Sequence, residues 1–218
     1  MEKLHTLFSH TYRLLSLLLL PPKYYDKKEL LILAEKIRDL IKDENVPGAV
    51  CSGLEKYIED LTRLVQKLYN DEDLWSKFKV NLTSTTISSA THVPCPPYES
   101  IYRFPTEPKR RMISMPATIS EINDFYRKLG LQVKDMQPIT GDHISVEVEF
   151  LAAIHDARKY SNDQEILELH SKFVEHVISW IPDFVECITK HGDENLNLIA
   201  HSLWKVIECD RKLAILTS

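Results

Sequence analysis

At 218 residues the chain is long enough for one sizeable core or two small lobes. Its composition, 44% hydrophobic and 27% charged residues, is that of an ordinary soluble globular protein and excludes a disordered or fibrous chain. The net charge is -5, and nucleic acids are bound mainly through clustered Lys and Arg, so nucleic acid is not expected as the main partner. An acidic surface suits a basic partner better.

The first predicted helix occupies the start of the chain, where apolar residues recur at helical spacing and end in the leucine run Leu14–Leu20. The run is too short to span a bilayer and lacks the small-residue cleavage site of a secretory signal peptide. Pro21 and Pro22 disfavour helix before them and are expected to close it. We therefore expect a core helix in a cytoplasmic protein without stable membrane insertion.

Helical periodicity continues through most of the chain and predicts an all-α protein. With only five glycines and no Asn-Gly or Asp-Gly signal, β-hairpins have little support. The apolar stripes lie at Leu30–Ile41, Leu54–Leu68, Ile119–Leu129, Ile166–Ile178 and Leu196–Ile207.

Capping patterns mark several expected helix ends. Gly130 and Gly192 stand where left-handed C-caps would end two helices. Capping boxes, which satisfy the free amides of a first turn, are predicted for Asp26 with Glu29, Ser52 with Glu55, and Thr118 with Glu121.

The four cysteines stand far apart without a C-x-x-C pair, which gives no support to zinc-ribbon or thioredoxin-type chemistry. We expect them to be free thiols in a reducing compartment. They are Cys51, Cys95, Cys187 and Cys209.

A proline-rich stretch, Thr91–Pro116, interrupts the helices with six of the eleven prolines. Because proline removes backbone donors, a long irregular connection is expected, and such loops in compact domains are usually functional. A disordered linker is the alternative, although the aromatics Tyr98, Tyr102 and Phe104 favour a loop that packs onto the core. The sequence KRRM at 109–112 is interpreted as a solvated charge cluster within this loop.

A second break at 130–141 divides residues 1–129 from 142–218 and is a candidate hinge within a single domain, 1–218. The stretch that follows, TGDHISVEVEF (140–150), alternates like a strand. No other segment alternates convincingly, so a strand would lack partners and a helix is the consistent choice. Thr140 is then the expected N-cap, with Asp142 in the first turn.

Asp142, His143 and Glu147 are candidates for chemistry. His143 and Glu147 would share a helix face, but a metal site needs three or four ligands, and the other histidines are scattered singly along the helices. An Asp beside a His is half of a catalytic triad, without a nucleophile signature or a phosphate loop. The plain structural interpretation is that Asp142 caps a helix and His143 is partly buried and hydrogen bonded.

Five segments form an ordered set: YRLLSLLLLPP (12–22), PPYESIY (96–102), DFYRKLGL (124–131), DHISVEVEFLA (142–152) and FVEHVISWIPDF (173–184). In order and spacing this set resembles the TorD/DmsD/NarJ family of chaperones that mature molybdenum-containing redox enzymes. The resemblance implies a single all-helical bundle without a cofactor or catalytic activity of its own. It also implies binding to the N-terminal leader, often a twin-arginine signal peptide, of an apo-molybdopterin oxidoreductase until its cofactor is inserted.

By position, Asp142 and His143 match the family's Asp-His pair, which is linked to peptide binding, and Pro97 and Tyr98 match its central loop. A leader with paired arginines and an apolar segment needs a groove with acidic groups at one end and apolar walls. Glu149 is a further candidate for the acidic end, and Trp75 for the walls. The expected peptide-binding residues are Pro97, Tyr98, Glu99, Ser100, Tyr102, Asp142, His143 and Glu147.

Two other functions stay open. One is a metal- or nucleotide-dependent enzyme centred on Asp142, His143 and Glu147. The other is a helical scaffold that dimerises by exchanging its last helices across the hinge at 130–141. A chaperone of the implied kind is expected as a monomer or as a domain-swapped homodimer.

Overall fold

The computed structural model describes residues 1–42, 51–87, 93–103, 108–133 and 139–216. Two short helical turns accompany the α-helices, namely the 3-10 turn η1 (Pro22–Tyr24) and the π turn η2 (Thr83–Ile87). The α-helices are α1 (Glu2–Leu19), α2 (Lys27–Ile41), α3 (Leu54–Asn70), α4 (Glu72–Leu82), α5 (Glu99–Tyr102), α6 (Pro108–Lys128), α7 (Ile144–Arg158), α8 (Gln164–Ile178), α9 (Ile181–His191) and α10 (Glu194–Leu216).

The prediction of an all-α protein is confirmed. The described residues form no β-strand, and Tyr98 and His143 make an isolated bridge. None of the described helices is both long enough and apolar enough to cross a membrane.

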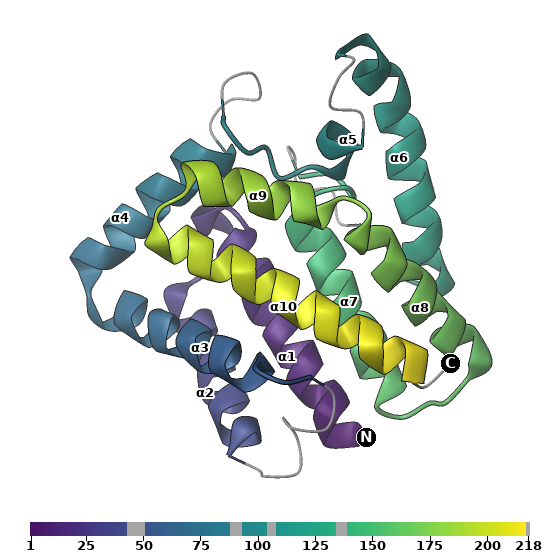
Figure 1. Ribbon diagram of the computed structural model, residues 1–218, viewed down its shortest axis with the longest axis horizontal. Helices are drawn as coiled ribbons and strands as arrows, with labels where there is room; N and C mark the ends of the chain where they lie inside the picture. The colour runs from purple at the N-terminus through teal and green to yellow at the C-terminus, as the bar shows by residue number, and fades with distance from the viewer. Residues whose placement is uncertain (43–50, 88–92, 104–107, 134–138, 217–218) are drawn as a thin grey trace.

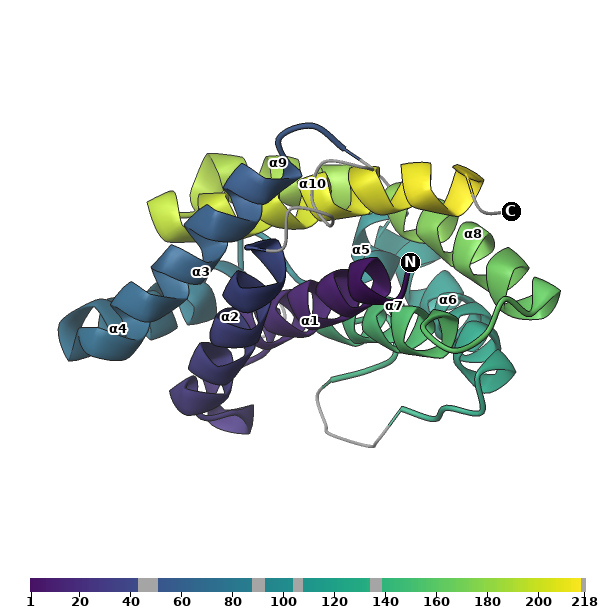
Figure 2. The ribbon, with the colours of Figure 1, turned by 90° about the horizontal axis from the view of Figure 1, so that it is seen from below.

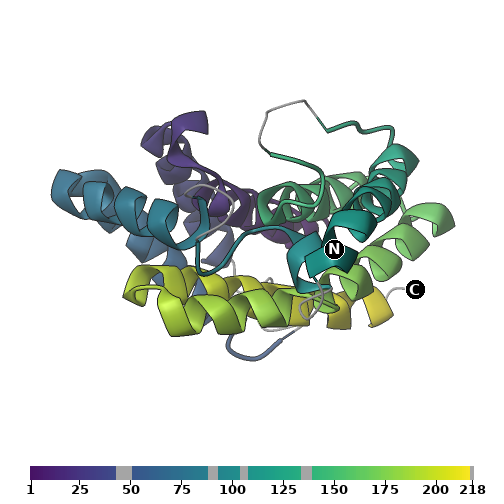
Figure 3. The ribbon, with the colours of Figure 1, turned by 90° about the horizontal axis from the view of Figure 1, so that it is seen from above.

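The helices form two layers (Figures 1, 2 and 3). Helix α10 lies across one face with α9 and α8 beside it, and α1, α2 and α7 lie behind them, as the edge-on view of Figure 2 shows. Helices α3 and α4 close one end of the molecule, and α6 closes the other. Helix α1 packs most extensively against α7.

Helix α1 is buried because it is apolar on most of its circumference. Leu7, Phe8, Leu14 and Leu18 are each at most 1% exposed. The helix ends at Leu19, with Leu20 as its C-cap before the two prolines, as predicted.

The capping predictions had mixed outcomes. The Asp26 side chain caps α2 and accepts a hydrogen bond from the amide of Lys28 at 2.9 Å. Gly130 is left-handed, at φ 69°, and ends its helix as predicted. Gly192 was predicted wrongly, because its φ of -83° is extended.

The capping boxes at Ser52 and Thr118 were also wrong. Helix α3 follows Gly53, at φ 81°, which makes no side-chain cap. Thr118 lies inside α6, which continues through Pro116. A proline inside a helix costs one backbone hydrogen bond but does not forbid the helix, so sequence spacing set its start too late.

The irregular connection between Thr91 and Pro116 is shorter than predicted. It is interrupted by α5, and α6 begins at Pro108, a residue type favoured at the first helical position. The KRRM sequence, 109–112, is therefore helical and not a loop. Phe104 and residues 134–138 of the predicted hinge lie outside the described residues.

The prediction of four free thiols was wrong. Cys51 is joined to Cys209, and Cys95 to Cys187, in disulfides with Cα–Cα distances of 5.4 and 5.7 Å. The partners are 158 and 92 residues apart in sequence, so spacing alone gave no sign of their proximity. The argument for a reducing compartment that rested on free thiols is lost with them.

Candidate functional site

The start of α7 positions the predicted Asp-His pair. The helix interpretation of residues 144–150 is confirmed, but the N-cap is His143 and not Thr140. Its Nδ1 accepts from the Ser145 amide at 3.2 Å and lies 2.7 Å from the Ser145 hydroxyl. Asp142 therefore precedes the helix and does not lie in its first turn.

Asp142 joins this helix start to the proline-rich segment. Its carboxylate accepts hydrogen bonds from the hydroxyls of Thr140 and Ser100, the latter at 2.6 Å. Its carbonyl accepts from the Glu99 amide at 2.9 Å, and the Ile144 amide donates to the Pro97 carbonyl at 2.8 Å. The fold thus brings together predicted site residues that are far apart in sequence, such as Ser100 and Asp142, which are separated by 42 positions.

The ring of His143 is held neutral in this position. It is 1% exposed and packs edge-on against Tyr98, with ring centroids 5.1 Å apart. Burial lowers the pKa of His143 from 6.5 to about 3. A neutral ring keeps the lone pair that caps α7.

Near this pair, the buried carboxyl groups of Glu99 and Glu147 contact three side chains that were not predicted as site residues. Trp180 donates from its indole nitrogen to Glu147 Oε2 at 3.1 Å, and His176 Nε2 lies 3.0 Å from Glu99 Oε2. Arg103 approaches Glu99 Oε1 at 3.2 Å. Burial, and then the charge of Glu99, raise the pKa of Glu147 well above its usual range.

The sequence carried a signal for this cluster. His176 and Trp180 belong to the F-x-x-H-x-x-x-W pattern at 173–180, and a spacing of four residues would place them on one helix face without saying what they face. Trp180 in fact follows the end of α8 and precedes α9. Arg103 had no such signal.

Tyr102 and Trp75, two aromatic residues expected to line the peptide groove, pack against different neighbours. Tyr102 stacks on Trp180 at 5.7 Å and meets Phe184 edge-on at 5.9 Å. Trp75 lies in α4 and packs instead against Tyr25 and Phe78.

Most of the predicted peptide-binding residues are covered. Glu99, Ser100, Asp142, His143 and Glu147 are each at most 1% exposed. Pro97 is also buried, and only Tyr98 and Tyr102 are partly accessible. In this conformation their polar groups join segments of the chain to one another, and peptide binding by them stays a prediction.

An accessible groove of about 610 Å³ lies beside the Asp-His pair. Its floor is apolar, and at its rim Arg13 Nε lies 3.3 Å from Glu149 Oε1. It is lined by Arg13, Ser16, Leu17, Leu20, Leu33, Tyr126, Leu131, Gln132, Val133, Ser145, Val146, Glu149, Phe150 and Ala153.

Two lining residues connect the groove to the predicted site. The Ser145 amide donates to the capping Nδ1 of His143, and the Tyr126 hydroxyl donates to the carbonyl of Gly141 at 2.7 Å. The groove wall therefore depends on the conformation of residues 141–145.

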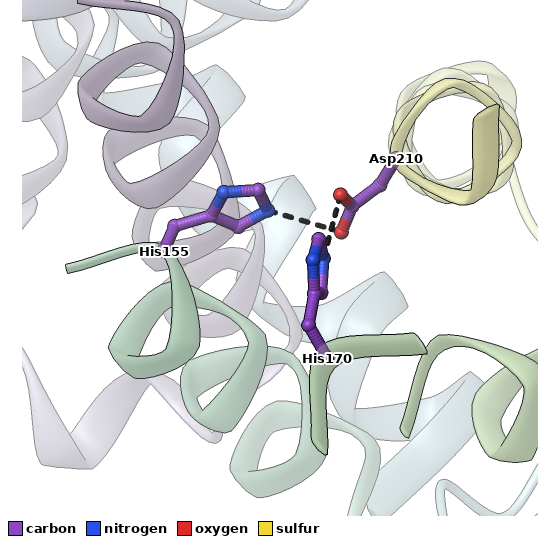
Figure 4. Close-up of side chains that lie close together, drawn as sticks. All are labelled: His155, His170 and Asp210. Carbon is purple, nitrogen blue, oxygen red and sulfur yellow. Dashed lines mark hydrogen bonds and ion pairs between the residues drawn. The ribbon is translucent and has the colours of Figure 1, made fainter. Parts of the chain in front are cut away.

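A second buried cluster lies farther along α7 (Figure 4). His155 Nε2 is 3.0 Å from one carboxylate oxygen of Asp210, and His170 Nε2 is 2.8 Å from the other. Tyr12 donates to Asp210 at 2.9 Å, and His5 Nδ1 lies 2.9 Å from His155 Nδ1. His155 and His170 lie on separate helices, as expected, but the packing of four helices brings them together, which the sequence did not indicate.

Arg158 determines how this second cluster is protonated. Its guanidinium can only donate, and it lies 2.5 Å from His170 Nδ1. Nε2 of a neutral His170 therefore carries the proton and donates to Asp210, which leaves no lone pair there for a metal ion. Although burial opposes it, the electrostatic interactions and hydrogen bonds with His155 and His170 hold the pKa of Asp210 well below its usual range.

The arrangement of Asp142, His143 and Glu147 does not support the alternative of an enzyme centred on these residues. Asp142 faces Ser100, His143 caps α7, and Glu147 joins Glu99 and Trp180. The three side chains do not converge on a common point.

Residues 49–186 match the family model described as nitrate reductase delta subunit. The chain belongs to the nitrate reductase delta subunit family. This is the NarJ/TorD type of chaperone family, so the resemblance in the sequence is confirmed. The delta-subunit family supports a role in molybdoenzyme maturation, as a chaperone rather than a catalyst.

The fold of this delta-subunit family member is also found in a crystal structure described as that of a candidate redox enzyme maturation protein from Archaeoglobus fulgidus. The two chains are 23% identical, with a TM-score of 0.56 over 92% of this chain and 93% of the other. This likeness shows the fold. No curated protein matches the chain.

Proposed function

We propose that this protein is a cytoplasmic chaperone that binds the N-terminal leader of an apo-molybdopterin oxidoreductase subunit. It would hold back assembly or export of that subunit until the molybdopterin cofactor is inserted. Family membership supports the maturation role. The observation that best supports leader binding is the apolar groove between α1, α2, α7 and the end of α6.

The groove suits the two chemical parts of a twin-arginine leader. Its apolar floor would bury the hydrophobic segment, at about 25 cal/mol per Å2 of apolar surface. Glu149, whose side chain is 49% exposed, would accept a leader guanidinium. Arg13 also pairs with Asp156, so it keeps a carboxylate partner if a leader arginine takes its place at Glu149.

Asp142 and His143 would act on binding indirectly. Through Ser145 and Gly141 they hold the groove wall, and through Ser100 and Pro97 they hold the proline-rich segment against α7. On this proposal Tyr98 and Tyr102, the two partly exposed members of the predicted site, are the ones able to touch a bound chain.

The groove is tested with the full-length protein and a synthetic leader peptide containing paired arginines followed by an apolar segment. Val146 is half-buried in the groove, so Val146→Asp places a charge where the apolar segment would lie. We expect calorimetry to show an affinity at least tenfold weaker, which corresponds to about 1.4 kcal/mol. Circular dichroism should show the same helix content as in the wild type.

Val80→Asp is the matched control, because Val80 is 66% exposed on α4, away from the groove. It should bind the peptide like the wild type. Equal affinity of wild type and Val146→Asp would remove leader binding from this groove.

A further inference from the structure

Glu99, Glu147 and His176 bring three metal-binding groups together from three helices. Glu99 begins α5, Glu147 lies in the first turn of α7, and His176 lies in the last turn of α8. One ligand atom from each side chain lies within 4.8 Å of the others. Both carboxyl groups are fully buried, and His176 is 8% exposed.

One oxygen of each carboxyl group, in Glu99 and in Glu147, is buried without a hydrogen-bond donor among the described residues. Glu147 Oε1 is buried and receives no hydrogen bond from the described residues, although Trp180 serves its other oxygen. Glu99 Oε1 has only the Arg103 guanidinium nearby, at 3.2 Å and without hydrogen-bond alignment. Two buried carboxyl groups side by side need a shared proton or a cation between them.

The ring of His176 is oriented as a metal ligand would be. Its Nε2 faces Glu99 at 3.0 Å, and its Nδ1 faces a second carboxylate, Glu121, at 4.0 Å. At 4.0 Å the Glu121 carboxylate is too far for a hydrogen bond, but it lies on the side of the ring where a carboxylate usually supports a metal-binding histidine. The buried His155, His170 and Asp210 cluster lacks this arrangement, since Arg158 donates to the distal nitrogen of His170.

We infer that Glu99, Glu147 and His176 bind one divalent transition-metal ion between α5, α7 and α8. Mixed imidazole and carboxylate donors favour such an ion over Mg²⁺ or Ca²⁺, which prefer oxygen ligands alone. The double charge of the ion balances the two carboxylates that the fold buries. Three protein ligands leave one position of a tetrahedral ion open.

Metal uptake must release protons. In the metal-free protein one proton stays with the Glu99–Glu147 pair, because burial and the neighbouring charge of Glu99 raise the pKa of Glu147. That proton leaves to solvent when both carboxylates bind the ion, because a metal ion binds only deprotonated ligands.

The consequence for the fold lies in α5. Glu99 is the residue through which α5 would be tied to α7 and α8 by the ion, and the neighbouring Ser100 is bonded to Asp142. An occupied site would hold the segment beside the Asp-His pair. This inference goes beyond leader binding and its test needs no leader.

The test uses full-length protein freed of metal with a chelator, titrated with Zn²⁺ by calorimetry in buffers of different ionisation enthalpy. We expect one Zn²⁺ per chain, proton release on binding, and a higher Tm of the loaded protein. Co²⁺ in place of Zn²⁺ should give the visible absorption of a low-symmetry site. Glu147→Gln keeps an acceptor for Trp180 but removes a ligand charge, and should weaken binding by at least roughly a hundredfold.

Glu175→Gln is the matched control, because Glu175 adjoins His176 but points to Arg211 at the surface. It should bind Zn²⁺ like the wild type. If Glu147→Gln does not fold, His176→Gln replaces it. The inference is overturned if the wild type takes up no Zn²⁺, or if it binds Zn²⁺ as tightly after Glu147 or His176 is replaced.

Discussion

His143 carries two tasks in one ring. Its Nδ1 caps α7, and its face and edge fill the space beside Tyr98. The capping task needs a neutral ring, because a protonated Nδ1 cannot accept from the Ser145 amide. The residue therefore links the protonation of one buried side chain to the start of a helix.

The pH dependence of stability should report this link. The pKa of His143 is about 3 in the folded protein and 6.5 when unfolded, so between these values only the unfolded chain takes up the proton. The free energy of unfolding then falls as the pH falls below 6.5, by up to about 1.4 kcal/mol per pH unit. His143→Asn keeps a capping side chain without the titration. Urea unfolding at pH 7 and pH 5 should show a stability loss smaller by about 2 kcal/mol in this variant.

His191→Asn is the control for that measurement, because His191 is exposed at the end of α9. It should follow the wild type at both pH values. A His143→Asn protein that loses as much stability as the wild type would show that His143 is not protected from protons in the folded state.

At the scale of the elements, the irregular residues 93–98 before α5 are held by long-range bonds. Cys95 is joined to Cys187 of α9, and its amide donates to the carbonyl of Thr85 at 2.9 Å. Two further backbone bonds tie residues 97 and 99 to residues 144 and 142. Little regular structure of its own holds this segment in place.

Removal of its disulfide should therefore loosen a defined region. We expect Cys95→Ala with Cys187→Ala to lower the free energy of unfolding by about 2–4 kcal/mol and to speed hydrogen exchange of the Glu99 amide. The measurements are denaturant unfolding and exchange followed by mass spectrometry.

The matched control is Cys51→Ala with Cys209→Ala, which opens the other disulfide. It should lower stability similarly but leave exchange at Glu99 unchanged. Equal exchange at Glu99 in both variants would mean that the segment is held without the Cys95–Cys187 bond.

The helices themselves were largely predictable, because each buries one apolar stripe whose period is visible in the sequence. The stripe of Leu54–Leu68 became α3, and the prolines after Leu20 ended α1. The start of α6 was not predictable, because whether a helix tolerates Pro116 depends on what surrounds it.

The site was predictable only in part. The order of motifs indicated that Pro97–Ser100 and Asp142–His143 belong together, and the fold joins them. Burial of Glu99 and Glu147, and their meeting with His176, depend on how three helices pack. No local pattern encodes such packing. The pairing of the cysteines was hidden for the same reason.

At the scale of the whole molecule, α1 connects the two parts of the chain that the candidate hinge divides. It belongs to the part before the hinge and packs there against α2, and it also packs against α7 and α10, which follow the hinge. A single continuous set of buried side chains runs from Leu4 to Leu213. One domain, 1–218, is therefore the expected cooperative unit.

Unfolding in urea with the disulfides intact should accordingly be a single transition. Tryptophan fluorescence reports on Trp75 in α4, Trp180 beside α5 and Trp204 in α10, while circular dichroism reports on all helices. Measured on variants that keep a single tryptophan, with the other two replaced by Phe, the fluorescence and dichroism midpoints should coincide within each protein. Separate midpoints would indicate that the parts before and after 130–141 unfold independently.

The two disulfides also set a condition on any exchange of helices between copies. Each joins a cysteine before residue 130 to one after residue 141, so both cross the candidate hinge. If residues 142–218 were traded between two chains, every native cystine would become a crosslink between molecules. Such a dimer would survive denaturant and come apart only with a reductant, and a monomer oxidised first could no longer trade its helices at all.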